Sequence, residues 1–95
     1  MDDIQDIQAL ILKDGRVLVA KIIEHEPEAI GEPDCIMVDP VIYDTTVEDY
    51  SKALSRFPGP NVTSATKIAI LSDNILIMVD PASKLLAEYL VTIGD

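Results

Sequence analysis

Residues 7–24 read IQALILKDGRVLVAKIIE, two aliphatic runs on either side of an Asp14-Gly15 pair. An Asp-Gly pair favours a tight hairpin turn because both residues tolerate a positive backbone φ. The flanking runs are rich in Val and Ile, whose β-branched side chains fit a pleated sheet better than a helix. The stretch therefore predicts an antiparallel pair of strands over residues 6–13 and 16–25.

Turn signals divide the next part of the chain. Residues 25–34 contain two prolines, one glycine and four acids, which predicts a loop. Residues 35–38 predict a third strand, which can continue through residues 41–43 if Pro40 marks a bulge or an edge position. Residues 45–57 are ambiguous: Thr45 and Glu48 have capping-box spacing, which favours a short helix before the Pro-Gly-Pro segment.

The last part of the chain predicts two strands and a helix. Residues 63–71, with Ile68 and Ile70 on one face, and the run of residues 75–79 predict strands on either side of a tight Ser-Asp-Asn turn. The second run is entirely apolar, which is typical of a strand buried on both faces. Asp80-Pro81 resembles a helix cap followed by an N1 proline, and the apolar stripe that follows predicts a helix over residues 81–93.

These elements predict one domain over residues 1–95. We expect a mostly β fold: a strongly bent five-stranded antiparallel sheet, or small open barrel, with its strands within about residues 7–79 and a C-terminal helix. The expected core includes Ile22, Val38, Ile68, Ile70, Ile75 and Ile77.

Composition favours self-association and opposes nucleic-acid binding. The 95 residues include 13 Ile, 9 Leu and 8 Val, which is much aliphatic surface for the core of so small a domain. The formal net charge of −10 repels phosphate backbones, so we expect no DNA partner. Exposed strand edges then predict pairing between copies of the chain.

The cysteine content and the N-terminal sequence favour a cytoplasmic protein. Cys35 is the single cysteine and is best interpreted as a buried thiol in a reducing compartment. The first residues lack the basic and apolar regions of a signal peptide. No apolar run has the roughly 18 residues of a membrane span, so we expect no membrane association.

The sequence offers little support for catalysis. Glu24, His25, Glu26 and Glu28 form the one cluster that resembles a metal or acid–base site, and we interpret it as a solvated acidic loop. No nucleophile has a patterned partner, and no glycine-rich phosphate loop is present. We therefore expect a protein that is not an enzyme, with no metal or other cofactor.

Two motifs resemble those of the Sm-like (LSm) family. Residues 12–22, LKDGRVLVAKI, are similar to its first motif, in which two strands flank an aliphatic-x-Asp-Gly-Arg turn, although Ala20 replaces the usual second glycine. Residues 70–77, ILSDNILI, are similar to its second motif, two apolar strands around a turn with Asp or Asn before an Ile. The resemblance implies a bent five-stranded sheet whose fourth and fifth strands pair with neighbours in a ring.

The family also binds RNA around its central pore, and here the sequence departs from the pattern. His25-Glu26 stands where the family has an aromatic residue and an aspartate, and Leu71-Ser72 replaces its Arg-Gly pair. The convincing helix is C-terminal, whereas family members usually carry it before the first strand. The remaining candidates for RNA contact are Lys13, Arg16, His25, Asp73 and Asn74.

Three functions remain open from the sequence. We expect a homo-oligomeric ring that serves as a scaffold or RNA-associated component, with weak or no RNA binding of its own. The alternatives are a genuine RNA-binding ring, and an adaptor that binds a protein partner through the acidic loop.

Overall fold

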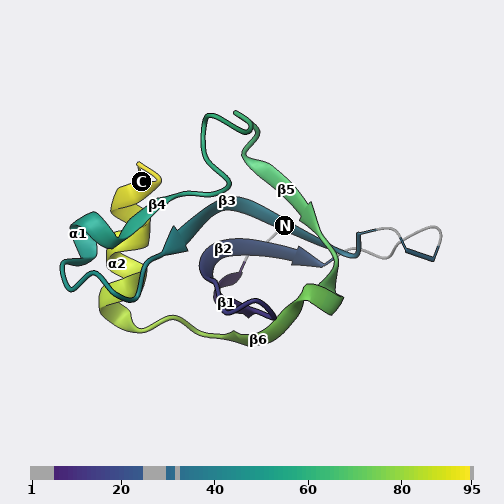
Figure 1. The fold of residues 1–95 in the computed structure, drawn as a ribbon, viewed down its shortest axis with the longest axis horizontal. Helices are drawn as coiled ribbons and strands as arrows, with labels where there is room; N and C mark the ends of the chain where they lie inside the picture. The colour runs from purple at the N-terminus through teal and green to yellow at the C-terminus, as the bar shows by residue number, and fades with distance from the viewer. Residues whose placement is uncertain (1–5, 25–29, 32, 95) are drawn as a thin grey trace.

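A computed structural model of the chain describes residues 6–24, 30–31 and 33–94 (Figure 1). The fold is mostly β, an open antiparallel sheet of six strands followed by a C-terminal helix. The strands follow the order β4-β3-β2-β1-β6, and β5 also pairs with β3. The predicted mostly β fold with a C-terminal helix is confirmed, with one more strand than expected. No described helix is long and apolar enough to cross a membrane.

The first hairpin forms where the sequence predicts it. β1 (Asp6–Leu12) and β2 (Val17–Glu24) pair antiparallel. Gly15 has a φ of 94°, which a glycine adopts without the steric cost of a Cβ atom. The Asp14 carboxylate accepts a hydrogen bond of 3.0 Å from the backbone N–H of Arg16, two residues later, and this bond stabilises the turn.

A bulge bends the third strand. β3 (Cys35–Tyr43) pairs with β2, and its register shifts between the pairs Lys21↔Val38 and Val19↔Val41. β3 therefore carries one extra residue there, and Asp39 has a φ of 51°. β3 passes through Pro40 and ends at Tyr43, so the predicted continuation of the strand past this proline is confirmed.

The ambiguous segment, residues 45–57, contains the short helix that the sequence favours. It also contains a strand that the sequence did not predict. α1 is Tyr50–Ala53, and its N-cap is Asp49, whose side chain accepts from the backbone N–H of Ser51. The predicted Thr45–Glu48 capping box was therefore wrong. β4 (Leu54–Arg56) follows directly and pairs with the second half of β3.

The last two strands lie at the edges of the sheet. β5 (Lys67–Ile70) is shorter than the predicted strand and pairs with the first half of β3. The 3₁₀ turn η1 (Ser72–Asn74) connects it to β6 (Ile75–Val79), which pairs with β1. Among the described residues β5 and β6 do not pair with each other, so the sheet is not closed, and Figure 1 shows them on opposite sides of β1–β3.

The C-terminal helix begins later than predicted. α2 spans Ser83–Thr92 and its N-cap is Ala82, which makes no side-chain cap. The Asp80 carboxylate instead accepts a hydrogen bond from the Gln8 side chain at 3.0 Å, so the prediction that Asp80 caps the helix was wrong. Gly94, with a φ of 88°, ends the helix as expected.

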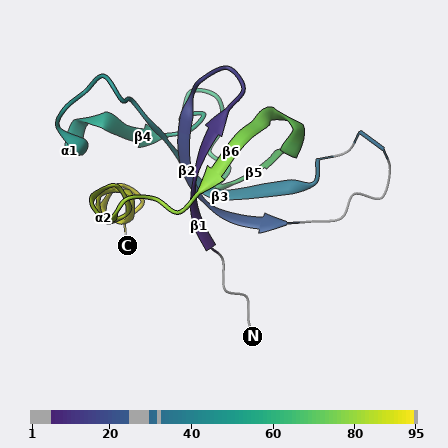
Figure 2. The same cartoon turned by 90° about the horizontal axis from the view of Figure 1, so that it is seen from below.

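The sheet has a core on each face. The strand-side core lies between β1–β3 and the β5–β6 segment and contains Leu10, Leu12, Leu18, Ala20, Ile22, Cys35 and Met37. The helix-side core lies under α2 and contains Val19, Val41, Ala53, Leu54, Leu85 and Tyr89. Figure 2 shows α1, β4 and α2 together at one end of the sheet. In a regular strand, residues an even number apart face the same side. Met37 and Val41 are four residues apart but face opposite cores, because the extra residue of the bulge reverses the alternation between them.

The predicted core is confirmed in part and needs correction at β6. Ile22 is buried, and the half-buried Ile68, Ile70 and Ile75 pack against the strand-side core. Val38 is also half-buried. Ile77, however, is exposed, and so are its neighbours in β6. The prediction that β6 is buried on both faces was wrong because neither a further strand nor a helix of the described chain covers it.

Candidate functional site

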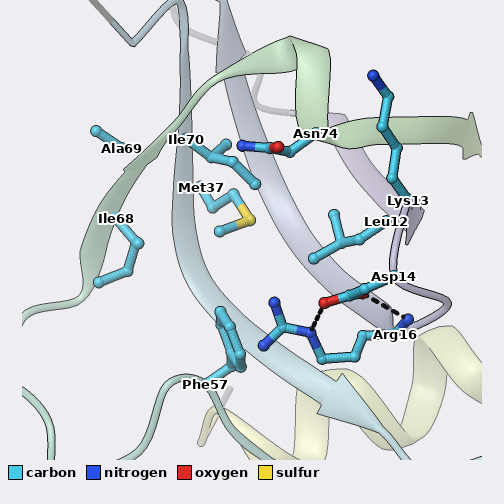
Figure 3. A pocket seen from close by; sticks show the side chains of 10 residues that line it. All are labelled: Leu12, Lys13, Asp14, Arg16, Met37, Phe57, Ile68, Ala69, Ile70 and Asn74. Carbon is cyan, nitrogen blue, oxygen red and sulfur yellow. Dashed lines mark hydrogen bonds and ion pairs between the residues drawn. The ribbon is translucent and has the colours of Figure 1, made fainter.

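A cavity of about 400 Å³ beside the first hairpin gathers three of the five predicted site residues. Lys13 and Arg16 reach it from the hairpin turn, and Asn74 reaches it from η1 (Figure 3). The backbone N–H of Lys13 donates to the Asn74 carbonyl at 2.9 Å, which fixes the two turns against each other. The other lining residues are Leu12, Asp14, Met37, Phe57, Ile68, Ala69 and Ile70.

The Arg16 guanidinium is held on two sides. Its Nε donates to Asp14 Oδ2 at 2.7 Å, and its Cζ lies 5.3 Å from the centroid of the Phe57 ring. Hydrogen bonds from the backbone N–H and the side chain of Arg16 lower the pKa of Asp14, so this carboxylate stays ionised at neutral pH. The geometry leaves the two terminal nitrogens of Arg16 turned away from Asp14 (Figure 3).

The remaining two predicted residues are not brought to this cavity. Asp73 is exposed in η1 and does not line it. His25 lies outside the described residues, as do Glu26 and Glu28 of the acidic cluster. In the described part of the chain, no three His, Cys, Asp or Glu side chains gather in a way that could hold a metal ion.

Asp34 and Phe57 are structural parts of this region that the sequence pattern did not indicate. The Asp34 carboxylate accepts from the backbone N–H of Ser72 at 2.7 Å and from the Ser72 hydroxyl at 2.6 Å, so it ties the start of β3 to η1. Phe57 follows β4 and packs against the strand-side core. Its position as the single Phe of the chain, immediately before Pro58-Gly59, was the available signal.

Cys35 is buried, as the sequence predicts, and is unsuited to nucleophilic chemistry. Burial raises the pKa of its thiol, and the negative charges of Asp34 and Glu24 add to that shift. A raised pKa lowers the fraction of reactive thiolate at neutral pH. The thiol therefore belongs to the core packing.

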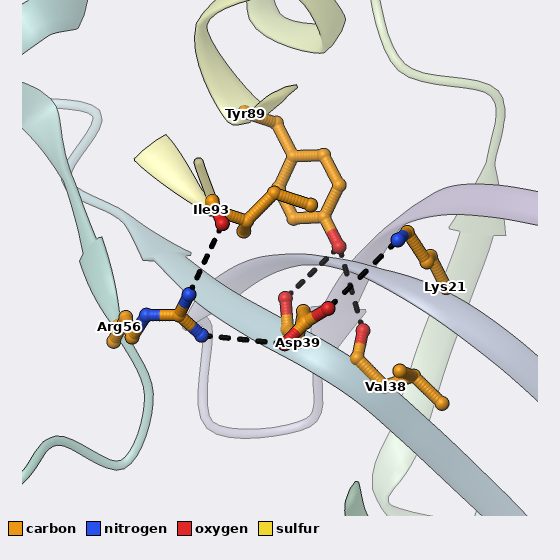
Figure 4. Close-up of polar contacts among 6 residues, drawn as sticks. All are labelled: Lys21, Val38, Asp39, Arg56, Tyr89 and Ile93. Atoms are coloured by element: carbon orange, nitrogen blue, oxygen red, sulfur yellow. Dashed lines mark hydrogen bonds and ion pairs between the residues drawn. The ribbon is translucent and has the colours of Figure 1, made fainter. Parts of the chain in front are cut away.

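A second polar cluster joins α2 to the bulge of β3 (Figure 4). The Tyr89 hydroxyl lies 2.9 Å from the Asp39 carbonyl oxygen, to which it donates. The Asp39 carboxylate lies 3.3 Å from Nη1 of Arg56 and 3.8 Å from Nζ of Lys21. Arg56 also donates from Nη2 to the Ile93 carbonyl at 3.3 Å. These contacts hold the helix end and the bulge together, which indicates a structural role.

β6 presents four exposed apolar side chains at consecutive positions. Leu76, Ile77, Met78 and Val79 are 63%, 43%, 38% and 46% exposed. They belong to an edge strand, whose outer backbone groups can pair with another strand. Contiguous apolar surface on a free edge is typical of an interface between proteins.

Comparison with known proteins gives a family but no function. No curated protein matches the chain. A family model described as a family of unknown function (DUF6561) matches residues 5–94, which is nearly the whole chain. On that match, the chain belongs to the DUF6561 family.

Proposed function

We propose that the chain is an Sm-like subunit that assembles with copies of itself into a ring and serves as a scaffold. The observation that carries the proposal is the exposed apolar strand β6 at one edge of the sheet. The strand path also supports it, because β6 pairs with β1 at one edge of the open sheet, while β5 and β4 pair with the two halves of β3 at the other edge.

Charges at the two edges favour antiparallel pairing of β5 in one copy with β6 in the next. Lys67 begins β5 and is exposed, and Asp80 follows directly after β6 and is also exposed. In an antiparallel pair the start of β5 lies beside the end of β6, so opposite charges of neighbouring copies meet. The same pairing places the side chains of β5 beside the apolar side chains of β6. It repeats head to tail from copy to copy, and it closes into a ring when the rotation between neighbouring copies divides a full turn.

The mass of the protein in solution tests this assembly. We expect multi-angle light scattering at micromolar concentration to give a discrete multiple of the 10.4 kDa chain mass. Apolar burial drives the association, so the mass should stay unchanged between low and high salt. A 10.4 kDa monomer at all concentrations would overturn the proposal.

Intrinsic RNA binding by this scaffold is weak or absent. Lys13 and Arg16 offer positive charge at the cavity, but Asp14 already pairs with Arg16 and the chain carries a net charge of −10. The contacts that remain are electrostatic and independent of base sequence.

Titration of fluorescent oligo-U and oligo-A at two salt concentrations measures this property. We expect weak binding that falls steeply with salt and is weakened by Arg16→Glu for both sequences alike, whereas Lys84→Glu on the exposed face of α2 should have less effect. Tight, salt-insensitive binding that prefers one sequence would show instead a genuine RNA-binding ring.

A further inference from the structure

The cavity beside the first hairpin opens into the hydrophobic core. Leu12 and Met37 belong to the strand-side core and are 5% and 1% exposed, yet both line the cavity together with Ile68 and Ile70. Core side chains reach the surface here because β5 and β6 leave the sheet open. The volume of about 400 Å³ lies within the range of about 300–1,000 Å³ that is usual for small-molecule sites.

The rim of the cavity is arranged to bind one oxyanion. The Asp14 carboxylate accepts a hydrogen bond from Nε of Arg16, and Phe57 lies against the guanidinium, so the Arg16 side chain is oriented before any ligand arrives. Within the described part of the chain, no hydrogen bond joins the two terminal nitrogens of Arg16 to a protein acceptor. This edge of a guanidinium can donate two parallel hydrogen bonds to a carboxylate.

Charge favours a singly charged ligand. Lys13, Arg16 and Asp14 together leave one excess positive charge on the rim, while the whole chain carries −10. A phosphate monoester carries nearly two negative charges at neutral pH and meets more repulsion than a carboxylate does. The aliphatic lining of Leu12, Met37 and Ile70 suits a flexible hydrocarbon chain.

We propose that this cavity binds a small aliphatic carboxylate, with its carboxylate on the terminal nitrogens of Arg16 and its hydrocarbon chain against Leu12, Met37 and Ile70. The inference goes beyond the proposed assembly, because every residue that it uses belongs to a single copy. Asn74 extends over the cavity near Ile70 and closes its side opposite Arg16 (Figure 3).

Methyl NMR of the full chain tests the site with octanoate as the probe. We expect saturable shifts of the Met37, Ile68 and Ile70 methyl signals, with the Val91 methyls on α2 unchanged. Octanol, which has the same chain without the charge, should bind at least about tenfold more weakly because it lacks the charge-assisted pair with Arg16. The comparison of octanoate with octanol uses the unchanged chain, so no substitution can disturb the fold.

Two substitutions locate the anion contact. Arg16→Gln should weaken octanoate binding at least about tenfold, since it removes both donors of the guanidinium fork. Lys84→Gln, which removes an equal charge from α2, should leave the affinity unchanged. Equal binding of octanoate and octanol, no saturation, or shifts confined to α2 would each overturn the proposal. Saturable binding of uridine monophosphate in place of octanoate would also overturn it and would assign the cavity to nucleotides.

Discussion

Tyr89→Ala is expected to lower the free energy of unfolding by about 3–5 kcal/mol, the range found when a large buried aromatic side chain is truncated. Tyr89 is 0% exposed and is the largest fully buried side chain among the described residues. It packs in the helix-side core against Val19, Val41 and Leu85. Truncation would leave a void between α2 and the sheet that the surrounding strands cannot fill.

The hydroxyl and the ring of Tyr89 can be separated experimentally. Tyr89→Phe keeps the ring but leaves the Asp39 carbonyl without this donor, which should cost about 1–2 kcal/mol. Val91 lies on the same helix, and its side chain is 67% exposed. Val91→Ala should therefore change the free energy of unfolding by no more than about 0.5 kcal/mol.

Urea unfolding of the four proteins, followed by circular dichroism, gives the free energies and the m-values. Equal losses for Tyr89→Ala and Val91→Ala would mean that α2 does not dock on the sheet. The comparison is made at one protein concentration, because assembly also contributes to apparent stability.

The parts of the fold that the sequence predicted depend on local chemistry. The first hairpin needs only the Asp14-Gly15 turn and two aliphatic runs, and both determinants lie within eighteen consecutive residues. The helix end at Gly94 is local in the same way. β4 could not be predicted because three residues, Leu54–Arg56, carry no periodicity, and they become a strand only by pairing with β3.

The apolar run of β6 shows a second limit of the sequence. An uninterrupted apolar strand indicates that it will be covered, but not whether its own chain or another copy covers it. Here β6 lies at an edge and stays exposed in a single chain.

The candidate cavity itself was not predicted, because it depends on contacts between distant segments, although three of its lining residues had been singled out as candidates for RNA contact. Lys13, Arg16 and Asn74 were singled out from two separate motifs, and the backbone bond between Lys13 and Asn74 brings those motifs together. Phe57 enters the cavity because β4 ends beside it, a placement that follows from the unpredicted strand. The bulge at Asp39 likewise decides which β3 side chains face each core.

The outer edge of β5 offers the sharpest test of the proposed assembly. The backbone N–H of Asp39 donates to the Thr66 carbonyl, so the backbone groups of residues 66, 68 and 70 face β3. Hydrogen-bonding directions alternate along an antiparallel strand, and the N–H groups of Lys67 and Ala69 therefore point to the outer edge. A proline at position 69 removes an outward donor without removing a bond to β3.

Ala69→Pro is accordingly expected to convert the assembled protein to a 10.4 kDa monomer in light scattering while the circular dichroism spectrum stays that of the folded chain. Ala82→Pro is the matched control, because Ala82 precedes α2 with a φ of −59°, close to the value that proline imposes. The control should retain the mass of the assembly. If Ala69→Pro also retains that mass, the copies do not associate through β5, and the exposed apolar face of β6 must contact a different surface of its neighbour.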